Sequence, residues 1–318
     1  MQRALLAALL TGLAAPAVGT YLVQRRLALM GDGIGHVALT GVALGLLTGW
    51  APVWTAVVVA TLGAVAIELL REHGRASADV ALAMLFYGGI AGGVLLVGLA
   101  GISAATLTTY LFGSVTTVSV GDLVLIAALT VVVLVLCIGL RPQLFAVCQD
   151  EEFARAAGIP VRVYSMLIAA MAAVTVVVAM RTVGLLMVSA LMVVPVATAQ
   201  QLARGFRATF SLALLLGVAA SLTGVTLSYY VDVAPGAAIV VVALFGFTLA
   251  WPAGSLLRRQ RFAGQRAETG RRGHVAAEEH VHEHDAECGH PGVPHDDHVD
   301  YLHGGHLHAR HGRHYDEH

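Results

Sequence analysis

Residues 121–140 read GDLVLIAALTVVVLVLCIGL, a run of twenty residues in which Asp122 is the only charged residue. A helix of twenty apolar residues is about 30 Å long and matches the hydrocarbon core of a bilayer. Runs of the same character and similar length lie on both sides of this segment, and each predicts a membrane-spanning helix. They cover residues 4–24, 29–49, 52–70, 79–100, 161–180, 183–203, 208–229 and 236–256.

The composition agrees with this pattern, because 57% of the 318 residues are apolar and only 12% are charged. A soluble domain of this length needs more surface charge, and the sequence lacks the strict alternation of a membrane β-barrel. We predict an all-α, polytopic transmembrane helical bundle with eight to ten spans. The number of spans is given as a range because the stretch between Gly101 and Val120 is less clearly apolar than the others. It contains Leu111-Phe-Gly-Ser114 and is interpreted as a shorter or re-entrant helix.

Arginines in the short loops predict the orientation. The loops alternate consistently if all of them face the cytoplasm, with Arg181 as the exception, so the C-terminus is expected on the cytoplasmic side of the cell (plasma) membrane. The first apolar run ends in Arg25-Arg26 and is interpreted as a span, not as a signal peptide. The arginines concerned are Arg25, Arg26, Arg71, Arg75, those from Arg141 to Arg162, Arg204, Arg207, Arg258, Arg259 and Arg261.

Small residues are frequent within the spans, for example Gly41 and Gly45, Gly88-Gly89 and Gly92-Gly93. Lipid provides no hydrophobic drive for helix association, so small residues promote it by letting backbones approach closely. We expect helix contacts at these glycines.

The character of the chain changes at Arg258. Residues 1–257 form the predicted transmembrane permease domain, and residues 258–318 form a polar, histidine-rich tail that cannot bury a core and is expected to be disordered. Thirteen of the 15 histidines follow residue 273. At this density neutral imidazoles favour several weak, exchanging metal sites, and a solvated low-complexity tail is the alternative. The candidate ligands are His280, His282, His284 and His290.

The chain contains no lysine, because all 19 basic residues are arginine. A P-loop ATPase needs its phosphate-binding lysine, so this chain is not one. If ATP drives the protein, another subunit must bind it, and we expect no enzymatic activity here.

Asp32 and His36 form the first candidate site, near the start of the second span. A spacing of four residues places both side chains on one face of a helix, about 6 Å apart at Cβ. An intramembrane carboxylate needs a partner or a wet cavity, and carboxylate oxygen with imidazole nitrogen suits zinc, manganese or iron. The alternative is a helix cap at Asp32 with a backbone hydrogen bond at His36. Two ligands do not close a site, but a pair from each half of a dimer would provide four.

The second candidate is the segment DEEFARAAG, which runs from Asp150 to Gly158 between two spans. Its charged start and terminal glycine predict a short helix outside the membrane. From charge alone, an ordinary solvated loop is the alternative.

Taken together, these motifs resemble the permease subunits of bacterial zinc and manganese ABC importers. The similarity covers residues 1 to about 257. It is carried by RRLALMGDGIGH (Arg25 to His36), Leu111 to Ser114, Asp150 to Gly158, Val183 to Met187 with Pro195 to Ala199, and Ser228 to Gly236.

The resemblance implies a homodimer in the lipid membrane, bound to two ATPase subunits and supplied by an extracytoplasmic metal-binding protein. It implies no permanently bound cofactor and no nucleic-acid partner. Asp32 and His36 match positions that face the translocation path and would ligate the passing Zn²⁺, or Mn²⁺ or Fe²⁺, transiently. The residues that match the segment docking into the ATPase are Asp150, Glu151, Glu152, Phe153, Ala154 and Gly158.

The chain departs from the family at two positions of this segment. The family usually has an aromatic residue before the aspartate and a proline after it, where this chain has Gln149 and Glu151. The geometry of docking is therefore expected to differ.

Two other functions remain open. A proton-coupled secondary transporter would need several acidic or histidine residues within spans, and besides Asp32 and His36 only Glu68 and Asp232 qualify. A membrane-anchored metal sensor or buffer would use the tail as its active part.

Overall fold

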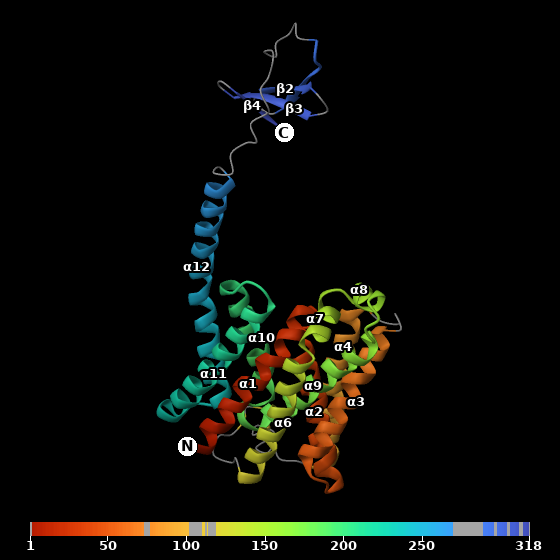
Figure 1. Cartoon of the computed structure of the whole chain (residues 1–318). Helices are drawn as coiled ribbons and strands as arrows, with labels where there is room; N and C mark the ends of the chain where they lie inside the picture. Colours follow the sequence, from red (N-terminus) through yellow and green to blue (C-terminus); the bar gives the residue numbers. More distant parts are fainter. Residues whose placement is uncertain are drawn as a thin grey trace. The chain divides into compact units, whose positions relative to one another are not determined.

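The computed structural model describes residues 2–72, 77–101, 110, 111, 113, 119–269, 289–295, 298–303, 306–311 and 314–317. The chain divides into two compact units, Met1–Gly254 and Ser255–His318. The first unit is a helical bundle (Figure 1). The helices of the chain are α1 (Gln2–Gln24), α2 (Met30–Thr48), α3 (Pro52–Glu72), α4 (Ala78–Ala100), α6 (Val120–Gly139), α7 (Arg141–Gln149), α8 (Glu151–Ala156), α9 (Val161–Val183), α10 (Leu185–Leu202), α11 (Phe206–Val231) and α12 (Pro235–Thr269).

Each span predicted from the sequence is present as a helix, which confirms the polytopic helical fold. Within the described ranges, eight helices are long and apolar enough to cross a membrane, and the apolar part of α10, Met187–Leu202, is shorter. Most of the stretch between Gly101 and Val120 lies outside the described residues, including Phe112 and Ser114, and so does the re-entrant helix predicted there.

The start of α6 explains the single charge in its apolar sequence. Ser119 Oγ accepts a hydrogen bond from the Asp122 amide, and the Asp122 carboxylate accepts one from the Ser119 amide, each at 3.1 Å. This reciprocal capping satisfies two amides at the helix end. Asp122 therefore begins the helix and is not a ligand inside it.

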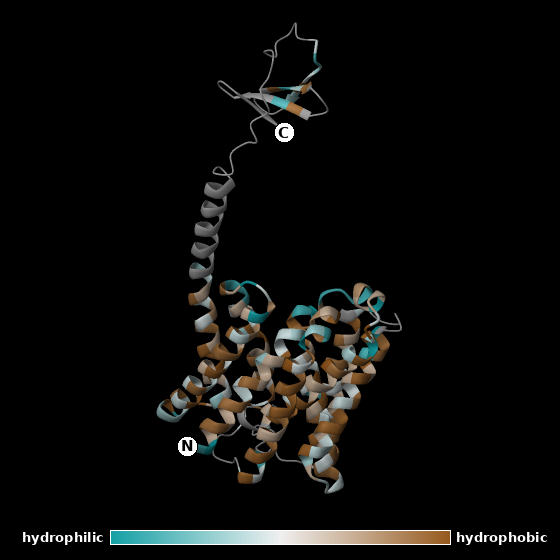
Figure 2. Ribbon diagram, viewed as in Figure 1, coloured by the Kyte–Doolittle hydropathy of each residue, from teal (hydrophilic) through white to brown (hydrophobic). Residues whose placement is uncertain are grey.

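The helices differ in how much of their surface other helices cover. The apolar windows of α1 and α9 are 72% and 67% buried, whereas those of α4 and α6 are each 22% buried. Figure 2 shows hydrophobic residues along the flanks of the bundle and hydrophilic residues at helix ends, including α8. The helices α4 and α6 therefore offer most of their apolar surface to lipid or to a partner.

Close approach at glycine is found at Gly41 and Gly89, whereas the contact expected at Gly88 is absent. A Cβ atom on Gly41 would lie 2.6 Å from the Ala56 Cα of α3, and one on Gly89 would lie 2.6 Å from the Val37 amide nitrogen of α2. No atom lies within 4 Å of a Cβ built on Gly88. The helix α2 is therefore held tightly between α3 and α4.

The second unit contains four short strands, which the composition alone does not predict. They are β1 (Gly292–His295), β2 (His298–His303), β3 (His306–His311) and β4 (His314–Glu317), paired in the order β1-β2-β3-β4 as an antiparallel sheet. Neighbouring side chains of β2 lie on opposite faces of the sheet, as in any strand: Asp300 is buried and Val299 is exposed. The last paired residues of each two neighbouring strands are both histidines: His295 with His298, His303 with His306, and His311 with His314.

Candidate functional site

Asp32 and His36 both lie on α2, with Asp32 in its first turn. The helix has no side-chain cap, because its N-cap position is Leu29. The negative charge of Asp32 is favoured there by the helix dipole, but the carboxylate does not cap the helix. Both residues are half-buried.

His36 faces α4. Its imidazole packs edge-on against the ring of Phe86, with 4.6 Å between centroids. One turn later, Thr40 Oγ1 donates a hydrogen bond to the Gly89 carbonyl at 2.8 Å. These contacts fix the backbone at His36 against α4.

Among the residues that the structure describes, neither the Asp32 carboxylate nor the His36 imidazole has a hydrogen-bond or ionic partner. The described residues also contain no group of three or more His, Cys, Asp or Glu side chains placed to hold a metal ion. Within the described ranges, two polar groups thus share one helix face, and no complete cation site is formed.

The contact at Gly89 gives a test of this geometry. Replacing Gly89 by Ala is expected to cost about 1–3 kcal/mol, because the added methyl group meets the α2 backbone beside His36. The thermal unfolding midpoint of the purified protein should fall. Gly88→Ala is the matched control, since its methyl group enters open space, and equal midpoints for the two variants would contradict the close approach.

The short helix α8 has the ends that its sequence predicts. Asp150 Oδ1 accepts hydrogen bonds from the Glu152 and Phe153 amides, both at 2.9 Å. At the other end Gly158 has φ +80°, a left-handed conformation that suits glycine and stops the helix. Ala154 is fully buried and Phe153 is 69% exposed. In Figure 1, α8 lies at the end of the bundle opposite the N-terminus.

Four charged residues form a closed ring beside α8, which we call the ion ring: Arg25, Glu68, Arg71 and Glu151. The Glu68 carboxylate lies 3.2 Å from Arg25 and 2.8 Å from Arg71. Glu151 Oε1 contacts Arg25 and lies 2.8 Å from Arg71. The side chains of Arg25 and Glu68 are 3% and 4% exposed, while that of Glu151 is 37% exposed.

The ring keeps Glu151 ionised. Burial raises the pKa of its carboxyl, but hydrogen bonds and charge from Arg71 and Arg25 outweigh burial, so its pKa lies below the usual value. A group with a lowered pKa stabilises the folded state above its unfolded pKa and loses this contribution as the pH falls through the folded value. At neutral pH the ring is therefore intact.

Sequence reasoning did not find the ion ring. It treated Glu68 only as a possible member of a proton relay, yet Glu68 is paired with two arginines. The local signal was the Glu68 and Arg71 pair at a spacing of three. The contacts with Arg25 and Glu151 join residues far apart in the sequence and needed the tertiary structure.

The predicted ligands of the tail lie mostly outside the described residues. This holds for His280, His282 and His284, whereas His290 lies immediately before β1. Burial raises the pKa of the Cys148 thiol of α7 to about 12.

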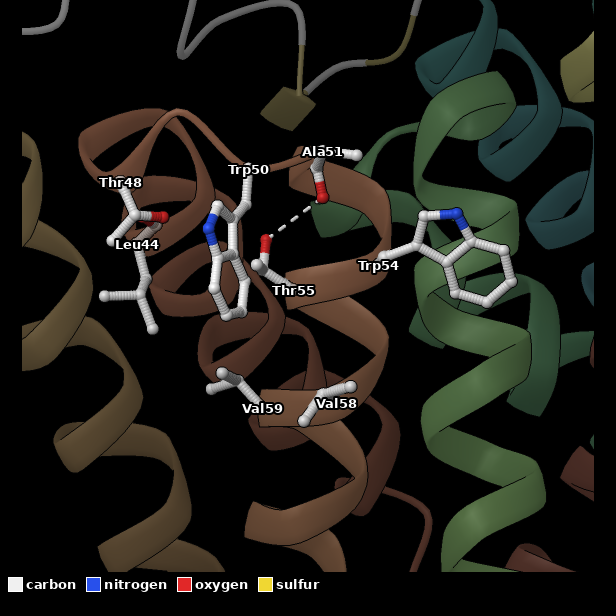
Figure 3. Close-up of a pocket in the computed structure, with 8 residues that line it drawn as sticks. All are labelled: Leu44, Thr48, Trp50, Ala51, Trp54, Thr55, Val58 and Val59. Atoms are coloured by element: carbon white, nitrogen blue, oxygen red, sulfur yellow. Dashed lines mark hydrogen bonds between the residues drawn. The ribbon is translucent and has the colours of Figure 1, made fainter.

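A pocket of about 650 Å³ lies at the turn between α2 and α3 (Figure 3). None of the residues lining it is acidic, histidine or cysteine, so it is not a cation site. Trp50 and Trp54 are exposed beside it, as in the aromatic belt of a membrane protein. The lining residues are Leu44, Thr48, Trp50, Ala51, Trp54, Thr55, Val58 and Val59.

Eight helices of spanning length among the described residues define this chain as a polytopic helical membrane protein. The chain belongs to the ABC 3 transport family, which matches residues 1–252. The resemblance seen in the sequence motifs is confirmed.

Two relatives and one solved structure illustrate the similarity. The manganese transport system membrane protein MntC of Halalkalibacterium halodurans is 35% identical over 253 residues, which are 79% of this chain and 86% of the relative. The high-affinity zinc uptake system membrane protein ZnuB of Haemophilus influenzae is 30% identical over 258 residues, 81% of this chain and 97% of the relative. The structure of PsaBC from Streptococcus pneumoniae in complex with Fab matches with a TM-score of 0.71 and 31% identity, over 79% of this chain and 90% of that one.

Proposed function

We propose that this chain is the permease subunit of an ATP-binding-cassette importer that moves a divalent transition metal into the cytoplasm, with zinc as the preferred metal. The observation that carries the proposal is the unpartnered Asp32 and His36 pair on one face of α2. A half-buried carboxylate in a membrane helix is costly unless it serves a passing ion or another charge. The names of the relatives support a metal as that ion.

The pair would bind the ion only transiently. Two ligands from one chain hold a cation weakly, and conduction requires that the ion also leaves. A second copy of the chain would add another aspartate and histidine across a dimer interface, which makes four ligands of the kind that zinc accepts.

The energy would come from a separate ATPase subunit that docks on the segment from Asp150 to Gly158. An exposed Phe153 beside a buried Ala154 supports this role, because α8 presents one apolar side chain outward while it stays anchored. An extracytoplasmic binding protein would deliver the metal to the other side. In this arrangement α8 and the C-terminal tail are cytoplasmic.

Zinc is favoured over manganese and iron by the donor set and by the histidines of the tail. Carboxylate and imidazole serve all three metals, and affinity generally rises from Mn²⁺ through Fe²⁺ to the later metals. The relatives include one named for manganese and one named for zinc. The delivering protein and metal availability therefore contribute to the choice.

The complete system tests the proposal. Cells expressing this chain with its ATPase and binding protein should accumulate zinc above cells without the chain. Changing the P-loop lysine of the ATPase should remove this accumulation, because the chain has no nucleotide site of its own. Uptake that persists without ATP hydrolysis but follows a proton gradient would support the secondary transporter.

The ion ring argues against that secondary transporter. Glu68, one of the few candidate relay residues, is neutralised by Arg25 and Arg71. Asp232 is exposed in a left-handed conformation at the end of α11. Of the four residues considered for a proton relay, Asp32 and His36 therefore remain as candidates within the membrane.

The tail is proposed to bind metal in an accessory role. Its backbone register pairs two histidines at the end of each of three neighbouring strand pairs, and histidine is a common zinc ligand. In the same uptake assay, a chain ending at Leu257 should still accumulate metal. Complete loss of accumulation would instead support the sensor or buffer.

A further inference from the structure

We propose that the ion ring transmits the movement of α8 to α1 and α3, with Glu151 as the positioning residue that makes the connection. This inference rests on the proposed docking of an ATPase at α8. It adds the residues through which a force on α8 would reach the proposed metal ligands.

The ring supplies contacts that the chain connectivity does not. The apolar side of α8 packs through Ala154 against Val147 of α7 and Val161 of α9, its neighbours in sequence. Glu151 reaches instead to Arg25, just after α1, and to Arg71 of α3. The carboxylate thus joins α8 to two helices that are remote in sequence.

A second polar contact joins the end of α1 to the end of α7, directly before α8. Gln24 Nε2 donates a hydrogen bond to Gln149 Oε1 at 2.6 Å, between the end of α1 and the residue before Asp150. Gln149 and Glu151 are the two positions where this segment departs from the family pattern. Gln149 contacts Gln24 at the end of α1, and Glu151 contacts the next residue, Arg25. A proline at position 151 would have no charge with which to bind Arg25.

The helix α3 extends this connection to the proposed metal ligands. Its Gly63 is so close to α2 that a Cβ atom there would lie 2.9 Å from Val37 Cγ1, beside His36. The contact of Gly41 with Ala56 joins the same two helices further along. Closely packed helices move together, so displacement of the end of α3 that carries Arg71 should move α2.

Glu151 is the member of the ring to substitute. It is the most exposed of the four, and the Glu68 contacts with both arginines remain when it is neutralised. Glu151→Gln keeps the size of the side chain and removes its charge. Asp232→Asn is the control, because Asp232 is an exposed acid at the end of α11 and lies outside the proposed docking segment.

The measurement is metal transported per ATP hydrolysed by the complete importer in lipid vesicles, with zinc as the probe. We expect Glu151→Gln to lower this ratio roughly tenfold while ATP hydrolysis stays within about twofold of wild type. Asp232→Asn should keep the wild-type ratio. Arg71→Gln should lower the ratio as well, and the double variant with Glu151→Gln should be no worse than the more affected single variant, as expected for residues acting in one ring.

Two results would overturn the inference. An unchanged ratio in Glu151→Gln would show that the ring does not transmit movement. Parallel loss of ATPase binding, hydrolysis and transport would show that Glu151 serves docking alone. Failure of the proposed function is a different outcome, because the wild-type importer would then move no zinc when ATP is supplied.

Discussion

Asp32→Asn and His36→Ala are each expected to reduce metal uptake to background while the chain still assembles with its ATPase. Asparagine keeps the shape of the side chain but removes the negative charge, and alanine removes the imidazole. Loss of even a supporting contact to a metal ligand lowers affinity or activity by roughly 10- to 100-fold, so loss of a ligand should cost at least as much. Initial rates of zinc uptake, measured with ATP in excess, provide the readout.

The control for the carboxylate is Asp232→Asn. Asp232 ends α11 with φ +56°, a conformation that asparagine also adopts, and its side chain is exposed. This variant should transport at the wild-type rate. Wild-type uptake by both Asp32→Asn and His36→Ala would remove the basis of the proposed function.

Glu68→Ala is expected to lower the free energy of unfolding by about 3–5 kcal/mol, because it leaves Arg25 buried with one partner fewer. The expected signs are a lower yield and a lower thermal unfolding midpoint in detergent. Glu152→Ala removes an exposed acid of the same type and should have little effect.

A second variant separates charge imbalance from lost packing. Glu68→Gln combined with Arg71→Gln removes one charge of each sign and should be more stable than Glu68→Gln alone. Equal or lower stability of the double variant would contradict the electrostatic account.

The fold could be predicted to a large extent. Nine apolar runs predicted nine helices, because in lipid a spanning segment must satisfy its backbone groups internally and a helix is the simplest way to do so. The glycines at Gly41 and Gly89 also predicted where helices would touch, although not which helix each would meet. The strands from Gly292 onward were not foreseen. A polar composition that cannot bury a core does not indicate which short segments pair as strands.

The site was predicted in part. The spacing of Asp32 and His36 placed them on one helix face, and Asp150 with Gly158 marked both ends of α8, as the structure has them. The roles of these residues remain proposals. The contact of His36 with Phe86 and the closure of the ion ring lie outside what spacing can reveal, because they join different helices.

Composition and hydropathy by themselves determined that this chain is a polytopic helical membrane protein without the lysine of a P-loop, since these properties depend on local runs and on residue types. Only the tertiary structure decided that Glu68 is neutralised between two arginines and that Glu151 joins α8 to α1 and α3. Those contacts depend on which helices lie side by side. Partner choice among similar apolar helices is made by packing over the whole bundle, which no short stretch of sequence encodes.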